Sequence, residues 1–128
     1  MSTPLLALVV DDSMLIRHTV CRFLETRGFQ VESATNGAEA LEMLGHIHPD
    51  IIVTDLQMPK MDGHQLMSAL KANPLTEAIP VIVLAGGQGS EEMQIESKYV
   101  IRKDIDIVSQ LCRTVEAILP GSLSQPVS

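Results

Sequence analysis

Apolar residues in this chain gather in short runs, separated by longer stretches with helical spacing. Three runs, residues 5–10, 51–55 and 80–84, are almost continuously apolar, as expected for strands buried on both faces of a sheet. Residues 29–34 instead alternate apolar and polar side chains, a pattern typical of a strand. A fifth run covers residues 99–102. The pattern therefore predicts five strands.

The stretches between these strands predict helices. Within residues 13–27, apolar side chains recur three and four positions apart, so one side of that helix is apolar. Similar stretches predict helices at about residues 38–44, 64–72 and 105–119. A short helix with Ser90 as its cap is expected over residues 90–97.

Strand and helix alternate five times along the chain. Connections between parallel strands are right-handed, and their helices cover both faces of the sheet. We therefore predict an α/β fold, a doubly wound sandwich around a five-stranded parallel sheet. Residues 1–120 are expected to form this single domain. From Pro120 onward the chain carries no charge and two prolines, so residues 121–128 are expected to be a flexible tail.

Composition narrows the class of protein. The 128 residues include 9 basic and 16 acidic ones, a formal net charge of −7, which argues against direct binding to nucleic acid or to an anionic membrane surface. No apolar stretch reaches the ~18 residues of a membrane span. The first residues lack the basic segment of a signal peptide. Cys21 and Cys112 are expected to be reduced and buried, with a disulfide as the alternative, so we expect a cytoplasmic protein.

Acidic residues follow two of the predicted strands. Asp11 and Asp12 come directly after the first strand, and Asp55 ends the third. If these strands are neighbours, the three carboxylates converge at one edge of the sheet, where like charges oppose each other's ionisation. A bound Mg²⁺ is the usual resolution, because it prefers oxygen ligands. The alternative is that an acid before the first helix is its cap, which leaves Asp55 unexplained.

Three segments carry a resemblance to a known family. They are Val9-Val-Asp-Asp-Ser13, Val53-Thr-Asp-Leu-Gln-Met-Pro-Lys-Met-Asp-Gly63, and Lys103 after the fifth strand. Together they resemble the receiver domain of bacterial two-component response regulators, over residues 5 to 119. This resemblance implies the flavodoxin-like receiver fold with strand order 2-1-3-4-5, as in single-domain regulators of the chemotaxis type.

The resemblance also implies a role for each matching residue. Asp55 corresponds to the phosphoacceptor, which takes a phosphoryl group from a histidine kinase or a histidine phosphotransfer protein. Asp12 corresponds to a direct Mg²⁺ ligand, Asp11 to its acidic companion, and the main-chain carbonyl of Gln57 to a third protein ligand. Lys103 corresponds to the lysine that pairs with the phosphoryl oxygens, although Arg102 is a rival for this role.

A further expectation concerns the backbone conformation of the loop after Asp55. Pro59 fixes its φ angle, and Gly63 is expected to adopt a backbone conformation that is closed to other residues.

The chain departs from the family pattern in its last third. The family has Thr or Ser at the end of the fourth strand, and its hydroxyl signals the arrival of the phosphoryl group, whereas this chain has Ala85. The glycine-rich segment that follows predicts a shortened or degenerate fourth helix. The family also has an aromatic residue three positions before the lysine and a proline after it. These positions hold Val100 and Asp104, with Tyr99 one place earlier.

These observations favour a receiver controlled by phosphorylation, which signals through a downstream protein that the sequence does not identify. Apart from accepting and hydrolysing its own phosphoryl group, it is not expected to be an enzyme. An aspartate-based phosphohydrolase needs a second acid two residues after its nucleophile, where this chain has Gln57. The remaining alternative is a receiver-like docking module that does not switch by phosphorylation, which Ala85 supports.

Overall fold

A computed structural model of the chain describes residues 4–58, 60–86, 99–103 and 106–119. Five parallel strands form one sheet in the order β2-β1-β3-β4-β5. The strands are β1 (Leu6–Val10), β2 (Gln30–Ala34), β3 (Ile51–Asp55), β4 (Val81–Ala85) and β5 (Tyr99–Arg102). The helices within the described residues are α1 (Met14–Thr26), α2 (Gly37–Met43), α3 (Gly63–Lys71) and α5 (Ile107–Ile118).

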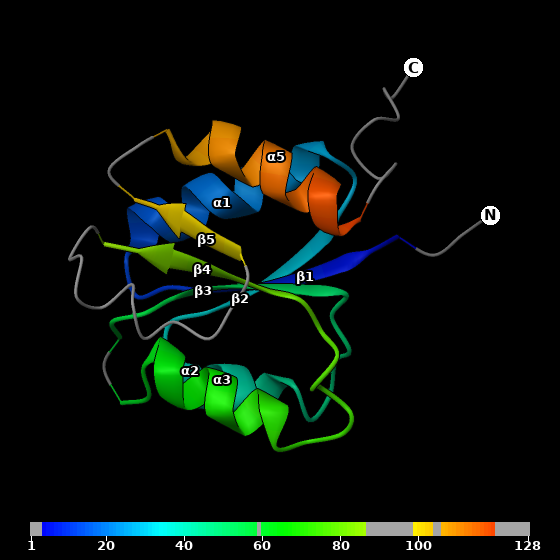
Figure 1. The fold of residues 1–128 in the computed structure, drawn as a ribbon, viewed down its shortest axis with the longest axis vertical. Coiled ribbons are helices and arrows are strands. Elements are labelled where there is room, and N and C mark those ends of the chain that lie inside the picture. Colours follow the sequence, from blue (N-terminus) through cyan, green and yellow to red (C-terminus); the bar gives the residue numbers. More distant parts are fainter. Residues whose placement is uncertain (1–3, 59, 87–98, 104–105, 120–128) are drawn as a thin grey trace.

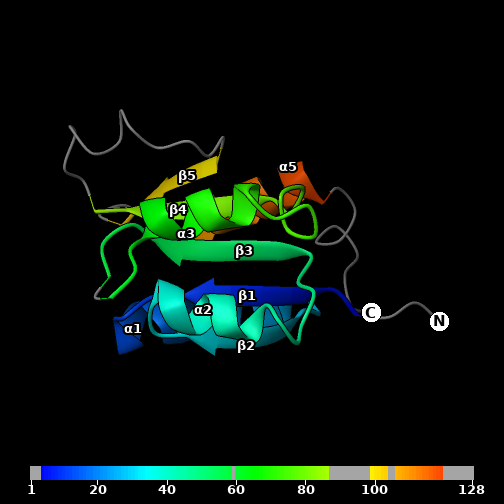
Figure 2. The ribbon, with the colours of Figure 1, turned by 90° about the horizontal axis from the view of Figure 1, so that it is seen from below.

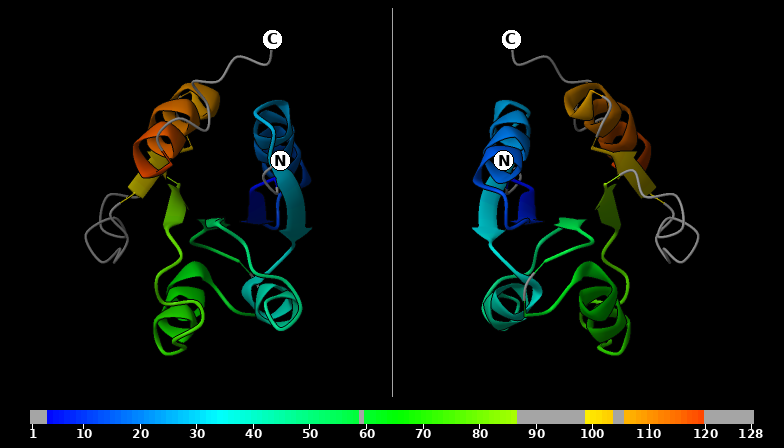
Figure 3. Two further views of the ribbon diagram at one scale, coloured as in Figure 1. Left: turned by 90° about the vertical axis from the view of Figure 1, so that its right-hand side faces the viewer. Right: turned by 90° about the vertical axis from the view of Figure 1, so that its left-hand side faces the viewer.

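The helices cover the sheet from both sides. α1 and α5 lie on one face, while α2 and α3 lie on the other (Figures 1 and 3). Alternate strand residues serve the two layers: Ala7 and Val9 of β1 pack towards α1 and α5, whereas Leu8 and Val10 pack towards α2 and α3. Figure 2 shows β1 and β3 side by side in the middle of the sheet. Their continuous apolar runs follow from this position, because a central strand has no face exposed to water.

Each helix begins at a polar cap that accepts a main-chain hydrogen bond. Ser13 caps α1, and Asn36 caps α2. Asp62 begins α3 with a capping box, because its side chain accepts from Gln65 N while the Gln65 side chain accepts from Asp62 N. Asp106 caps α5 through the amide of Ser109. These caps set where the loops at the carboxyl end of the sheet stop.

The predicted fold class and strand order are confirmed. α2 begins at Gly37, one residue earlier than predicted, because the Asn36 side chain caps it by accepting from the Glu39 amide. The short helix predicted over residues 90–97 lies outside the described residues, as does the tail at 121–128. The domain boundary at residue 120 stays a prediction.

Two further expectations concern the helices. Cys21 and Cys112 are free thiols, so they form no disulfide, but both are only half-buried rather than fully buried as predicted. Among the described residues, no helix is both long enough and apolar enough to cross a membrane.

Candidate functional site

Asp11 lies fully buried where β1 ends, and its polar groups are held from several sides. Its main-chain N–H donates to the carbonyl of Ala34 (3.1 Å), and its carbonyl accepts from Arg17 Nη1 of α1 (2.8 Å). Its carboxylate oxygen Oδ1 accepts from the N–H of Ser13 (2.8 Å). The cap of α1 is Ser13, whose Oγ accepts from the Ile16 amide, so neither acid is the helix cap.

Asp55 ends β3 and is almost completely buried. One carboxylate oxygen, Oδ1, accepts from the N–H of Leu56 (2.8 Å). The other, Oδ2, lies 2.9 Å from the Lys103 ammonium nitrogen. The side chain is therefore held in one orientation, with one oxygen against the main chain and the other against a positive charge.

The register of the sheet brings the acids together. β1 pairs with β3, Val10 lying opposite Thr54, so the residues that follow both strands meet at the carboxyl edge. Carboxylate oxygens of Asp11, Asp12 and Asp55 lie within 4.8 Å of one another. Asp12 is the exposed member of the three. Gln57, also exposed, lies in the loop two residues after Asp55.

Lys103 reaches this cluster from the end of β5, the edge strand that lies beyond β4. Its main-chain N–H donates to the carbonyl of Ala85 (2.8 Å), which continues the pairing of β5 with β4 by one residue. Its Nζ lies 2.9 Å from Asp55 Oδ2 and 3.6 Å from Asp11 Oδ2. The sequence offered Lys103 and Arg102 for the contact with the phosphoryl group. The charged group of Lys103 is the one that lies against Asp55 and Asp11.

Burial and charge act in opposite directions on these groups. Burial raises the pKa of Asp11, as does the nearby Asp55 charge, and the hydrogen bond from Ser13 only partly offsets them. Burial lowers the pKa of Lys103, but its hydrogen bond and charge interaction with Asp55 outweigh this, so that pKa is raised overall. The ammonium is thus held in its charged form between two carboxylates.

The oxygen set fits a hard divalent cation. Among the described residues, Asp11 Oδ2 accepts no hydrogen bond although it is buried, and its contact with Lys103 is long. The cluster contains three carboxylates, and Lys103 brings one ammonium to it, so negative charge is in excess. Carboxylate oxygens in an open cluster are the ligands that Mg²⁺ uses, together with water. The cluster can therefore hold a metal ion.

The loop after Asp55 is held by close packing rather than by an unusual glycine conformation. A Cβ on Gly63 would lie 2.4 Å from the Asp55 carbonyl oxygen and 2.9 Å from Leu56 Cα. The expectation that Gly63 has a φ angle closed to other residues was wrong, because the residue with positive φ in this loop is Lys60 (φ 68°). Gly63 is needed for space, since its N–H donates to Leu56 O (2.8 Å).

A second glycine holds the same loop from the side of α2. The N–H of Gly37 donates to the carbonyl of Met61 (3.0 Å), and a Cβ on Gly37 would lie 2.7 Å from that oxygen. Gly37 was not among the residues predicted to form the site. The signal for Gly37 in the sequence is the pair Asn36-Gly37 before an apolar helix, which predicts a turn but not the contact with Met61.

The end of β4 is apolar where the family has a hydroxyl. Ala85 is buried and packs in a cluster with Leu56, Met67 and Val83. At the position of the family's aromatic residue, Val100 is 39% exposed. Tyr99 pairs with Ile82 near the start of both strands, away from the acids, so it does not replace that aromatic.

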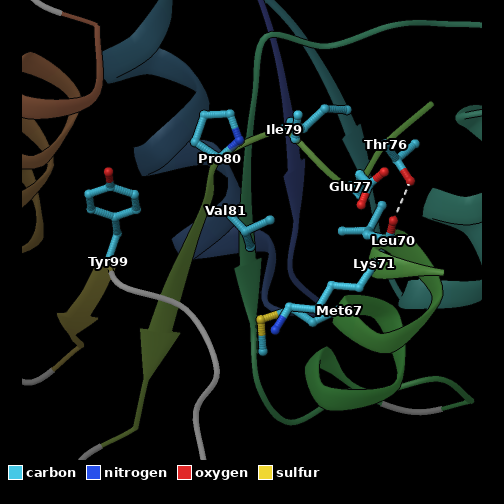
Figure 4. A pocket seen from close by; sticks show the side chains of 10 residues that line it. Met67, Leu70, Lys71, Thr76, Glu77, Ile79, Pro80, Val81 and Tyr99 are labelled. Atoms are coloured by element: carbon cyan, nitrogen blue, oxygen red, sulfur yellow. Dashed lines mark hydrogen bonds between the residues drawn. The ribbon is translucent and has the colours of Figure 1, made fainter. Parts of the chain in front are cut away.

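A pocket of about 320 Å³ lies at the opposite, amino end of the sheet. Figure 4 shows its lining side chains, from α3, the segment before β4, and Tyr99 of β5. The Thr76 hydroxyl in this pocket is already used, because it donates to the Leu70 carbonyl (2.7 Å). The acid cluster is at the other end of the strands, so the pocket plays no part in its chemistry.

A parallel sheet in the order 2-1-3-4-5, with acids after β1 and β3 and a lysine after β5, defines the class of protein. A family model of the response regulator receiver domain matches residues 7–114. The chain belongs to this family. Receiver domains are signalling modules that take phosphoryl groups from histidine kinases and act on downstream partners.

Individual relatives agree with this assignment. Protein PilG of Pseudomonas aeruginosa is 38% identical over 88 residues, which cover 69% of this chain and 65% of PilG. Response regulator Rre1 of Synechocystis is 35% identical over 96 residues, 73% of this chain and 42% of Rre1. These matches span less than two thirds of either relative. The chemotaxis response regulator CheY4 of Vibrio cholerae is 28% identical, with a TM-score of 0.82 over 91% of this chain and 100% of that one.

Proposed function

We propose that this receiver accepts a phosphoryl group on Asp55 and is controlled by that modification. The observation that carries the proposal is the pairing of Asp55 Oδ2 with the Lys103 ammonium at 2.9 Å, beside the carboxylates of Asp11 and Asp12. This arrangement gives a carboxylate nucleophile, a fixed positive charge, and oxygen ligands for a metal ion. The whole set lies at the carboxyl edge of the sheet, where ligands of such folds bind.

The proposed reaction is a transfer from a phosphohistidine. An oxygen of the Asp55 carboxylate attacks phosphorus, a P–O bond forms, and the P–N bond breaks with its electron pair going to the imidazole. Lys103 stabilises the negative charge on the phosphoryl oxygens, because its ammonium is already at the nucleophile. Asp11, Asp12, Asp55 and the main-chain carbonyl of Gln57 would hold Mg²⁺, which when bound supplies further positive charge to those oxygens.

A small-molecule phosphodonor tests the chemistry without a partner. Incubation with acetyl phosphate and Mg²⁺ is expected to add one phosphoryl group to the intact mass, and Asp55→Asn is expected to abolish it. The matched control is Asp50→Asn, because Asp50 precedes the same strand and instead accepts the Leu6 N–H. A phosphoryl group retained in Asp55→Asn would contradict the assignment.

The metal site is tested by calorimetry with Mg²⁺ on the same proteins. Asp12→Ala is expected to weaken Mg²⁺ binding by about tenfold or more, because even residues that only hydrogen-bond to a metal ligand contribute that much to metal affinity. Unchanged affinity in Asp12→Ala would show that the ion, if bound, lies elsewhere.

The physiological donor is proposed to be a sensor histidine kinase or a histidine phosphotransfer protein in the cytoplasm. Asp55 is only 5% exposed, so a donor must come close to the sheet edge. Met14 and Leu15, which begin α1 beside Asp12, are 75% and 73% exposed, and two large apolar side chains in water favour a protein surface as their partner. The net charge of −7 argues against nucleic acid or an anionic membrane in that position.

A docking surface at Met14 and Leu15 is tested by comparing a protein donor with acetyl phosphate. Converting both Met14 and Leu15 to Ala is expected to slow transfer from a phosphorylated histidine phosphotransfer protein by about tenfold, as for loss of ~1.4 kcal/mol of contact. The rate with acetyl phosphate should not change. Equal losses with both donors would mean that the substitutions disturb the acid cluster and not a docking surface.

A further inference from the structure

The outer edge of β5 carries a side-chain contact that continues the sheet. β5 is the last strand, so every second residue turns its main-chain N–H and C=O away from β4. Lys103 N–H bonds towards β4, at Ala85 O, and the groups of Arg102 therefore face outward. Such groups need partners other than a strand.

Gln110 of α5 supplies both partners. Its Nε2 donates to the carbonyl of Arg102 (2.9 Å), and its Oε1 accepts from the Arg102 N–H (3.0 Å). The side-chain amide thus presents the donor and acceptor that the peptide of a sixth strand would present. Its Nε2 also donates to Asp106 O (3.1 Å), which ties the pair of bonds to the start of α5.

This contact lies one residue before Lys103. The main chain is held at Arg102 by Gln110 on one side, and at Lys103 by the Ala85 carbonyl on the other. Asp104 follows, without the fixed φ angle that a proline would bring. The direction in which the Lys103 side chain leaves the strand therefore depends on contacts that hold the main chain in place.

We propose that Gln110 is a positioning residue, which sets the Lys103 ammonium against Asp55 by clamping the main chain of Arg102. This inference rests on the proposed phosphorylation of Asp55. Gln110 acts through Lys103 and not through the metal ligands, since its bonds are to β5 and α5. Loss of the clamp should thus weaken the handling of the phosphoryl group while leaving metal binding intact.

The test uses Gln110→Leu, which keeps the bulk but removes the amide, and Gln110→Glu, which keeps the acceptor but places an oxygen against the Arg102 carbonyl. Glu116→Gln, an exposed change on the same helix, is the control.

In Gln110→Leu, amide exchange at Arg102 should accelerate. The rate with acetyl phosphate and the affinity for beryllofluoride should each fall about tenfold, as expected for a displaced positive group. Mg²⁺ affinity should stay unchanged, and Gln110→Glu should show a loss of the same kind.

A double-mutant cycle separates positioning from general damage. In a Lys103→Met background, Gln110→Leu should cause no further loss of the residual rate, because the ammonium that it positions is already gone. Additive losses, or a parallel fall in Mg²⁺ affinity, would overturn the proposal, as would wild-type rates in both Gln110 variants. If the wild-type chain itself neither reacts with acetyl phosphate nor binds beryllofluoride, the proposed function fails. The clamp would in that case still be visible in the exchange of the Arg102 amide.

Discussion

The two halves of the sheet differ in how far their site residues match the family pattern. On the β1–β3 side, each acid of the family pattern is present, and Asp11 is held by hydrogen bonds with Ala34, Ser13 and Arg17. On the β4–β5 side, the lysine is present, but the residues around it are not those of the family. Ala85 ends β4 in an apolar cluster, and Gln110 clamps β5 from outside.

From this difference we infer that accepting a phosphoryl group and responding to it place separate demands on the sheet. Acceptance needs a nucleophile and positive charge, and these depend on strand ends that meet at one edge. A response needs a group whose contacts change when the phosphoryl group is bound, because a ligand shifts an equilibrium only by its differential contacts. The first requirement falls on the residues at the ends of β1, β3 and β5, while the second falls on the end of β4, where this chain has Ala85.

The largest expected effect tests how tightly the β3 side is packed. Gly63→Ala would place a Cβ against main-chain atoms of Asp55 and Leu56, which cannot move aside like a flexible side chain. We expect a loss of about 2–3 kcal/mol in the free energy of unfolding, measured by urea denaturation. Gly45→Ala, whose Cβ would come no closer than 3.3 Å to its neighbour, serves as the control and should cost much less. A Gly63→Ala protein as stable as Gly45→Ala would show that the loop is loosely packed.

A second change probes the β4 side. Ala85→Thr restores the hydroxyl, which can donate to a phosphoryl oxygen, and a hydrogen bond to a charged acceptor is worth ~1.5–3 kcal/mol. We expect beryllofluoride to cause only a small change in amide shifts around Ala85 and Lys103 in the wild type. In Ala85→Thr that change should be larger, because ~1.4 kcal/mol is already tenfold in population.

Ala85→Val is the matched control for this experiment, because it has the branched shape of Thr without the hydroxyl. Ala85→Val should respond like the wild type. A full response in the wild type that Ala85→Thr does not enlarge would show that another donor reads the phosphoryl group, such as the main-chain amide of Gly86.

The smallest expected effect concerns how much the charge of Asp11 lowers the free energy of unfolding. Because the pKa of Asp11 is raised in the folded state, its ionisation opposes folding, and stability falls as pH rises through that pKa. Asp11→Asn removes the charge and keeps an oxygen for the Ser13 amide. In EDTA at neutral pH we expect it to be more stable by about 1 kcal/mol. The gain should shrink as pH falls through the raised pKa of Asp11, because the wild-type carboxyl then becomes protonated. A gain that does not depend on pH would show that shape, not charge, is responsible.

Much of the architecture could be predicted from local patterns. The continuous apolar runs predicted that β1, β3 and β4 are buried on both faces of the sheet, and the spacing of apolar residues predicted α1 and α3 to within a few residues. The site was less accessible, because its geometry comes from residues far apart in the chain. The contact of the Lys103 ammonium with Asp55 could not be predicted from adjacent positions, because it depends on the register of β5 against β4.

The sequence by itself determined the alternation of strands and helices, the family, and the three acids, since each is written in spacing or in a short motif. Only the tertiary structure decided that Gly63 is needed for space and that Gln110 holds β5 next to Lys103. The physical reason is the range of the contact. Periodicity and caps act within a few residues, whereas a clamp between a helix and a strand edge exists only after the sheet has brought both to the same place.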